Sequence, residues 1–137
     1  MIGVISSGSW ALALAQVLAD NHHDLIVYSR SKEQCDDINN NHKNSKFFDV
    51  VINPKIKCSN DFNVLNDCDV LLLATPTSGF EEILSKLYET LDHEVLIINV
   101  AKGFYHKDNS RVSCVIKDKL KDKCKDVVSL IGPSHAE

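Results

Sequence analysis

The turn after the first apolar segment of the chain carries the small residues that a phosphate-binding loop needs. A dinucleotide-binding fingerprint reads G-x-G-x-x-G or G-x-G-x-x-A, and Ser6, Gly8 and Ala11 occupy its three positions. Gly8 lets the backbone approach a pyrophosphate, and Gly8 and Ser9 offer amides at the N-terminus of the next helix, where the dipole favours an anion. The pattern predicts a nucleotide-phosphate site; the alternative is a tight strand–helix turn that binds nothing.

The residues after the second apolar segment indicate which nucleotide such a site would prefer. Residues 28–32 hold a guanidinium, two serine hydroxyls and an ammonium, but no carboxylate. An acid at this position binds the ribose 2′-hydroxyl of NAD, whereas a basic side chain such as Arg30 suits the 2′-phosphate of NADP. We therefore expect NADP(H) to be preferred over NAD(H) as cofactor. The alternative is a solvated start of a helix.

Two later strand ends also carry polar groups. Lys102 and Gly103 follow an apolar run, and a lysine there can donate to a phosphate or polarise a carbonyl group. Gly132, Pro133 and Ser134 follow the last apolar run. The alternatives are a surface lysine in a turn, and a turn in which Ser134 caps a final helix.

Apolar runs and helical periodicity alternate along the chain. Short apolar runs bounded by polar residues or glycine predict strands that are buried on both faces. Apolar residues spaced three and four apart predict helices. The expected strands are Ile2–Ile5, Leu25–Tyr28, Val70–Ala74, Val95–Val100 and Val127–Ile131. The expected helices are Trp10–Asp20, Lys32–Asn40, Phe80–Leu91 and Val112–Leu120, and a loop is expected over 41–60.

This alternation predicts an α/β fold with a doubly wound, mostly parallel sheet of the Rossmann type. A chain of 137 residues is one domain's length, so we expect residues 1–137 to form a single dinucleotide-binding domain. Ligands in such sheets bind beyond the carboxyl ends of the strands, where the winding reverses. The polar groups described above all follow predicted strands, so we expect them to share that edge.

Composition narrows the classes of function. The apolar fraction of 44% and the charged fraction of 25% are ordinary for a globular domain. A net charge of −4 disfavours a broad nucleic-acid-binding face. No apolar run approaches the roughly 20 residues that cross a bilayer, and no secretory signal is evident. We expect a cytoplasmic protein with no nucleic-acid partner and no membrane insertion.

The cysteines and histidines show no metal-binding pattern. The five cysteines are odd in number and none is spaced C-x-x-C, which indicates reduced thiols. His22 and His23 are adjacent in a polar turn, where two rings rarely point at one ion. We expect no metal site.

Several motifs occur in an order and spacing that we recognise. They are Gly8-Ser9-Trp10 with the alanine-rich helix after it, Asn41-His42, Ala101-Lys102-Gly103, Gly132-Pro133-Ser134 and Ala136-Glu137. In this combination the whole chain resembles the N-terminal, cofactor-binding part of bacterial-type NAD(P)-dependent glycerol-3-phosphate dehydrogenase. That family reduces dihydroxyacetone phosphate to sn-glycerol 3-phosphate, the backbone of phospholipids.

The resemblance implies roles for particular residues. It implies cofactor contacts at Ser9, Trp10, Arg30, Ser31, Phe47, Lys102 and Ala136, in addition to the turn at Gly8. It implies substrate contacts at Lys102, Gly132 and Ser134. A small phosphorylated triose is the implied substrate, and a homodimer is a candidate state of the full-length enzyme.

The sequence departs from the family pattern at three points. Ser6 and Ala11 replace glycines, and Asp49-Val50 replaces a Pro-Gly pair in the long loop. The general-acid lysine and substrate domain of the family would lie beyond Glu137, so we expect no catalytic residue within 1–137 and no turnover by these residues alone. The alternatives are a non-catalytic nucleotide-binding module and a related hydroxy-acid dehydrogenase domain.

Overall fold

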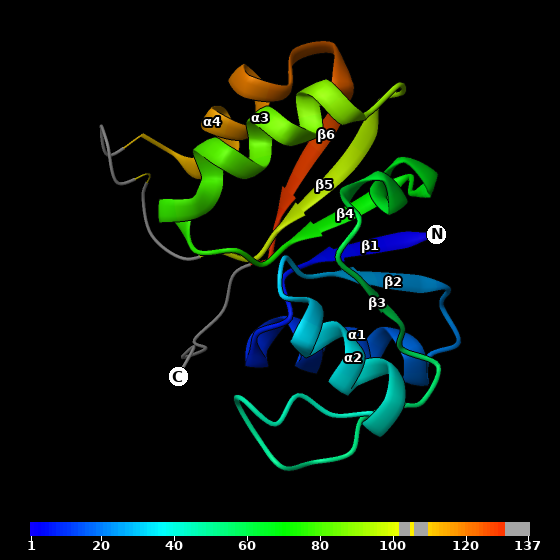
Figure 1. Cartoon of the computed structure of the whole chain (residues 1–137). Coiled ribbons are helices and arrows are strands. Elements are labelled where there is room, and N and C mark those ends of the chain that lie inside the picture. The colour runs from blue at the N-terminus through cyan, green and yellow to red at the C-terminus, as the bar shows by residue number, and fades with distance from the viewer. Residues whose placement is uncertain (102–104, 106–109, 131–137) are drawn as a thin grey trace.

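A six-stranded parallel sheet with helices on both faces forms the domain (Figure 1). The computed structural model describes residues 1–101, 105 and 110–130. The strands are β1 (Ile2–Ile5), β2 (Leu25–Tyr28), β3 (Cys58–Ser59), β4 (Val70–Leu73), β5 (Val95–Asn99) and β6 (Cys124–Ser129). The helices of the described part are α1 (Ser9–Asp20), α2 (Lys32–Asn41), α3 (Phe80–Thr90) and α4 (Val112–Leu120).

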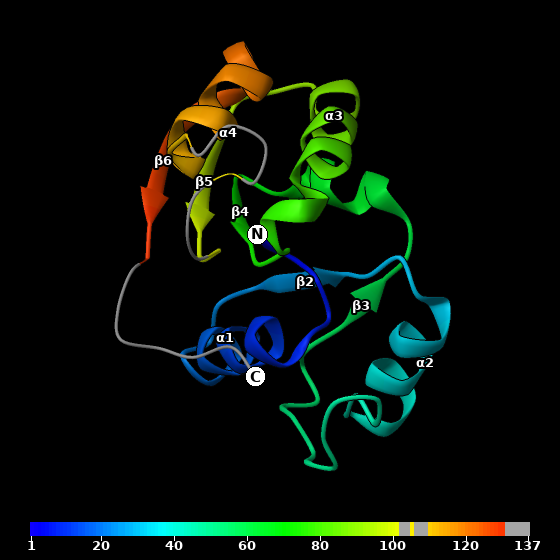
Figure 2. The same cartoon turned by 90° about the vertical axis from the view of Figure 1, so that its left-hand side faces the viewer.

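The two helix layers bury two separate apolar cores. Helices α1 and α2 cover one face of the sheet, and α3 and α4 cover the other (Figures 1 and 2). Successive side chains of a strand point to opposite faces, so Val4 packs in the first core and Ile5 in the second. Both are essentially without solvent exposure, which explains why β1 is a continuous apolar run rather than an alternating one.

The strand order β3-β2-β1-β4-β5-β6 fixes where the winding reverses. The chain proceeds outward from β1 through β2 to β3, then returns to place β4 on the opposite side of β1. The carboxyl ends of β1, β2 and β4 therefore surround a topological switch point. The expectation of a doubly wound, Rossmann-type sheet is confirmed.

Three local features differ from the sequence-based expectation. The region 41–60 contains β3, which has only two residues and gives no periodic signal. A 3-10 helix, Phe62–Asp67, precedes β4 where no element was expected. Strand β6 begins at Cys124 rather than Val127. The start of this edge strand is largely exposed and contains a lysine, so it gives no apolar run, and it pairs with β5 across an irregularity at Val95/Leu96.

The cysteines of the chain are free thiols. Cys35 on α2 and Cys58 on β3 are both buried, and their sulfur atoms lie 2.9 Å apart. Burial beside Cys35 raises the pKa of the Cys58 thiol, which keeps it protonated and unreactive at neutral pH. Within the described residues no group of three or more histidine, cysteine, aspartate or glutamate side chains could hold a metal ion. In the same part of the chain no helix is long and apolar enough to span a membrane.

Gly3 in the centre of β1 provides a test of this packing. A Cβ atom there would lie 2.7 Å from Leu71 Cδ2 and 2.9 Å from Leu65 Cδ2, which is closer than packed carbon atoms approach. We expect Gly3→Ala to lower the free energy of unfolding by about 1–3 kcal/mol, because the fully buried Leu65 and Leu71 side chains must shift to admit the methyl group. Urea unfolding followed by circular dichroism measures the change.

The control is a double-mutant cycle with Leu71→Val, which removes the contacting Cδ atoms. The double variant should lose less stability than the sum of the two single variants. Strictly additive losses would contradict the proposed clash.

Candidate functional site

A cavity of about 670 Å³ opens at the switch point of the sheet. Its walls come from the β1–α1 turn, the β2–α2 turn, the segment after β4, the start of α3, and the loop that follows α2. No single element forms it, so the cavity exists only because parallel strands bring these segments to one edge.

The predicted site residues fall into two groups. Six of them line this one cavity, although they are spread over 40 positions of the chain: Gly8, Ser9, Trp10, Arg30, Ser31 and Phe47. The other four, Lys102, Gly132, Ser134 and Ala136, lie outside the described residues. The geometry therefore brings together the β1, β2 and long-loop parts of the predicted site.

The β1–α1 turn contains an unusual backbone conformation at Ser6. Its φ angle is 132°, a region that glycine adopts readily and that strains a residue with a side chain. The Ser6 hydroxyl accepts a hydrogen bond from the backbone N–H of Gly8 at 3.1 Å. Gly8 is the N-cap of α1 and has no other side-chain cap. The serine that replaces the first glycine of the fingerprint thus satisfies an amide at the anion-binding end of the helix.

Two other cavity residues differ in how far the protein satisfies their polar groups. The indole Nε1 of Trp10 is inaccessible to solvent and has no hydrogen-bond partner among the described residues. Ser31 is the N-cap of α2, since its hydroxyl oxygen accepts from the backbone N–H of Gln34 at 3.2 Å. The Ser31 hydroxyl hydrogen can still be donated to a ligand. Ser31 therefore offers a donor to a ligand in the cavity, whereas Trp10 Nε1 is covered by the protein.

A buried polar network connects the walls of the cavity. The Ser7 hydroxyl lies 2.6 Å from Gln34 Oε1 and 2.8 Å from the Ser29 hydroxyl. Asn44 Nδ2 donates to the same Gln34 oxygen at 2.9 Å and to the Ser7 carbonyl at 2.7 Å. These contacts tie the β1–α1 turn, the β2–α2 turn, α2 and the following loop into one unit.

No motif in the sequence indicates this network. Gln34 lies in a polar helix and Asn44 in a polar loop, and neither has the spacing of a known motif. Asn44 is only 1% exposed, which is unusual for a loop asparagine. Burial of that kind is decided by contacts between segments that are distant in the sequence.

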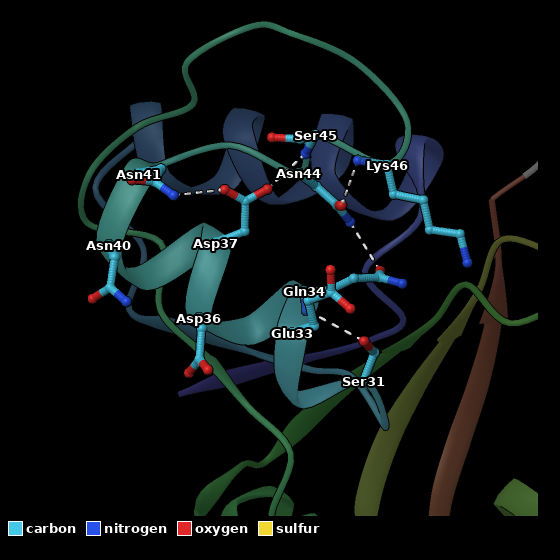
Figure 3. A pocket seen from close by; sticks show the side chains of 10 residues that line it. All are labelled: Ser31, Glu33, Gln34, Asp36, Asp37, Asn40, Asn41, Asn44, Ser45 and Lys46. Atoms are coloured by element: carbon cyan, nitrogen blue, oxygen red, sulfur yellow. Dashed lines mark hydrogen bonds between the residues drawn. The ribbon is translucent and has the colours of Figure 1, made fainter.

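A second, more polar hollow of about 730 Å³ lies beside α2 (Figure 3). Its central carboxylate, Asp37, accepts from the Ser45 backbone N–H at 2.7 Å and from Asn41 Nδ2 at 2.9 Å. These hydrogen bonds, that from Ser45 first, lower the pKa of Asp37. Asp37 is therefore ionised at neutral pH and holds the loop after α2 against the helix.

Residues 1–137 match the sequence profile of the family described as NAD-dependent glycerol-3-phosphate dehydrogenase N-terminus. A glycerol-3-phosphate dehydrogenase [NAD(P)+] of Streptococcus uberis is 38% identical over 99% of this chain and 41% of its own length. The corresponding protein of Oceanobacillus iheyensis is 36% identical over 99% of this chain and 40% of its own length. The chain thus spans about two fifths of these relatives.

Solved structures give the same fold. Glycerol-3-phosphate dehydrogenase of Coxiella burnetii superposes with a TM-score of 0.80 at 21% identity, over 98% of this chain and 41% of that one. The Saccharomyces cerevisiae enzyme superposes with a TM-score of 0.86 at 23% identity, over 98% of this chain and 42% of that one. At these identities the likeness concerns the fold.

The strain at Ser6 can be tested by comparing two substitutions. Ser6→Ala and Ser6→Gly both remove the hydroxyl that Gly8 contacts, but only Ser6→Gly also removes the Cβ atom. We expect the glycine variant to be the more stable by about 1 kcal/mol, because the φ of 132° costs a residue with a side chain about 1–3 kcal/mol.

Urea unfolding of the two variants measures this difference. At an unstrained position alanine would be the more stable residue by about 0.4–1 kcal/mol, since it restricts the unfolded chain. That ordinary ranking at position 6 would contradict the strained conformation.

Proposed function

The chain belongs to the family of NAD-dependent glycerol-3-phosphate dehydrogenase N-terminal domains, and from this we propose that residues 1–137 form a domain that binds NADP(H) at the switch point of the sheet. The observation that carries the proposal is the single cavity lined by Gly8, Trp10 and Arg30. Its place at the carboxyl ends of β1, β2 and β4 is the place where parallel sheets bind dinucleotides.

The residues around the cavity fit such a cofactor. Apart from its neighbours in the chain, a Cβ atom on Gly8 would have only the Ser6 hydroxyl oxygen, at 3.5 Å, within 4 Å among the described residues, so these leave the space beside Gly8 open. The N-terminus of α1 supplies backbone amides and a positive dipole end for a pyrophosphate. Ser31, after β2, can donate its hydroxyl hydrogen to a ligand. Together these groups suit an anionic ligand with further hydrogen-bond acceptors.

The preference for NADP(H) rests on Arg30. This side chain is exposed at the cavity after β2, with no carboxylate of the described residues within ion-pair distance. A guanidinium can bind a phosphate through two parallel hydrogen bonds. The 2′-phosphate that distinguishes NADP(H) from NAD(H) would lie here.

For the complete protein, we propose the reduction of dihydroxyacetone phosphate to sn-glycerol 3-phosphate. The support is that the relatives are glycerol-3-phosphate dehydrogenases [NAD(P)+], of whose length this chain covers about two fifths. When bound, the reduced nicotinamide supplies the hydride. The proposed roles of this domain are to orient the dinucleotide and to contribute Lys102, Gly132 and Ser134 to the phosphorylated triose, with Ala136 beside the cofactor. The general-acid lysine would come from a region that corresponds to the part of the relatives not matched by residues 1–137. For the full-length enzyme we also propose a homodimer.

The proposal predicts that Arg30→Ala weakens NADPH binding about tenfold and changes NADH binding less than threefold. A charge-assisted hydrogen bond contributes about 1.5–3 kcal/mol, and solvent exposure favours the lower end of that range. Fluorescence titration can follow energy transfer from Trp10, the single tryptophan of the chain, to the reduced nicotinamide.

The matched control is Lys32→Ala, which removes a neighbouring cation that is paired with Asp36 at 3.0 Å. It should leave both dissociation constants unchanged. No binding of either dinucleotide by the wild type would overturn the proposed function, and equal losses for both cofactors in Arg30→Ala would overturn the role of Arg30.

A second prediction concerns the open space beside Gly8. Gly8→Val should abolish binding of NADPH and NADH alike, because the added side chain occupies the position that the pyrophosphate needs. Circular dichroism should show that the variant remains folded, since the backbone of Gly8 is in an extended conformation that valine also adopts. Undiminished binding by a folded Gly8→Val protein would mean that the anion site is elsewhere.

A further inference from the structure

The basic residues between positions 30 and 46 divide into two kinds. Lys32 is paired with Asp36 at 3.0 Å, and Lys43 is paired with Asp49 at 2.8 Å. Hydrogen bonding to Asp49 raises the pKa of Lys43, as expected for a lysine whose charge is already matched. Neither of these two lysines lines the switch-point cavity.

Arg30 and Lys46 complete the lysines and arginines of this segment, and both line the cavity. No carboxylate of the described residues lies within ion-pair distance of either one. The remaining cation of the cavity wall, Lys86, is 3.3 Å from Glu82, which lines the same wall. In a chain of net charge −4, the described residues of the cavity wall therefore include two positive charges with no carboxylate partner among the described residues, both contributed by the segment 30–46.

The buried network determines where Lys46 lies. Asn44 Oδ1 accepts from the backbone N–H of Lys46 at 3.3 Å, while the other end of the Asn44 amide is held by Ser7 and Gln34. Figure 3 shows the Lys46 side chain extending away from Asp36 and Asp37. The ammonium group also lies 5.7 Å from the centre of the Phe47 ring.

The neighbours of Lys46 identify the part of a dinucleotide that it would meet. Ser31, Gln34 and Lys46 line both the switch-point cavity and the polar hollow beside α2, so they mark the boundary between the two. This boundary is at the first turn of α2, on the β2 side of the cavity. The pyrophosphate would lie instead at the N-terminus of α1, next to Gly8.

We propose that Lys46 is a second specificity-determining cation, which binds the 2′-phosphate of NADP(H) together with Arg30. The inference rests on the proposed function and adds a residue to it. Two cations match the double charge of a phosphate at neutral pH, whereas the 2′-hydroxyl of NAD(H) gains little from either. Asn44 is the corresponding positioning residue, since it fixes the loop that carries Lys46.

The test compares Lys46→Ala, Lys46→Arg and the matched control Lys43→Ala, which removes a paired lysine from the same loop. The ligands are NADPH and NADH, together with adenosine 2′,5′-bisphosphate and adenosine 5′-monophosphate, which isolate the effect of the 2′-phosphate. We expect Lys46→Ala to weaken NADPH and the bisphosphate about tenfold, and NADH and the monophosphate less than twofold. Lys46→Arg should retain most of the affinity, and Lys43→Ala should match the wild type.

The salt dependence of binding gives a second readout. Loss of a phosphate-binding cation should reduce the dependence of the NADPH dissociation constant on salt concentration, because fewer charges are screened. Equal weakening of NADPH and NADH would overturn the inference and place Lys46 at the pyrophosphate. Wild-type affinity in Lys46→Ala would overturn it as well, while the proposed function would stand as long as the wild type binds NADPH. Binding of neither cofactor by the wild type would overturn the proposed function itself.

Discussion

Strand β1 constrains the rest of the domain, because it pairs on both edges and is buried on both faces. Its register aligns Ile5 with Tyr28 on one side and with Leu73 on the other, so the three strands end at the same level. Val4 and Ile5 pack into opposite cores. A shift of one residue would exchange the two faces and misalign the turns after β1, β2 and β4. The position of the cavity is therefore a consequence of how this strand is buried.

The turns themselves are made rigid by hydrogen bonds rather than by apolar packing. Ser7, Ser29, Gln34 and Asn44 satisfy one another at the base of the cavity, in a region where an unpaired polar group would be costly. The Ser29 hydroxyl also accepts from the Ser31 backbone N–H at 3.2 Å, which extends the unit toward the residues after β2. A binding site on loops thus gains the fixed geometry that loops alone do not provide.

The electrostatics of the cavity depend on which charges are paired. Lys32 and Lys43 have carboxylate partners at 3.0 and 2.8 Å, and contacts of this kind at the surface add little stability. These ion pairs affect ligand binding instead, because they neutralise Lys32 and Lys43, whereas Arg30 and Lys46 keep their charges for a ligand in the cavity. The acidic net charge of the chain therefore coexists with a locally positive site.

The sequence by itself determined the fold class, the order of the four helices and five longer strands, and the β1, β2 and long-loop residues of the candidate site. It could do so because continuous apolar runs, helical periodicity and small residues after a strand are local signals with direct structural causes. It did not determine β3, the early start of β6, the buried network around Asn44, or which lysines pair with a carboxylate. These features arise from contacts between residues far apart in the chain, such as Asn44 with Ser7, and no spacing within a short segment encodes them. The tertiary structure alone decided them, because burial and pairing depend on which segments the sheet brings to the same edge.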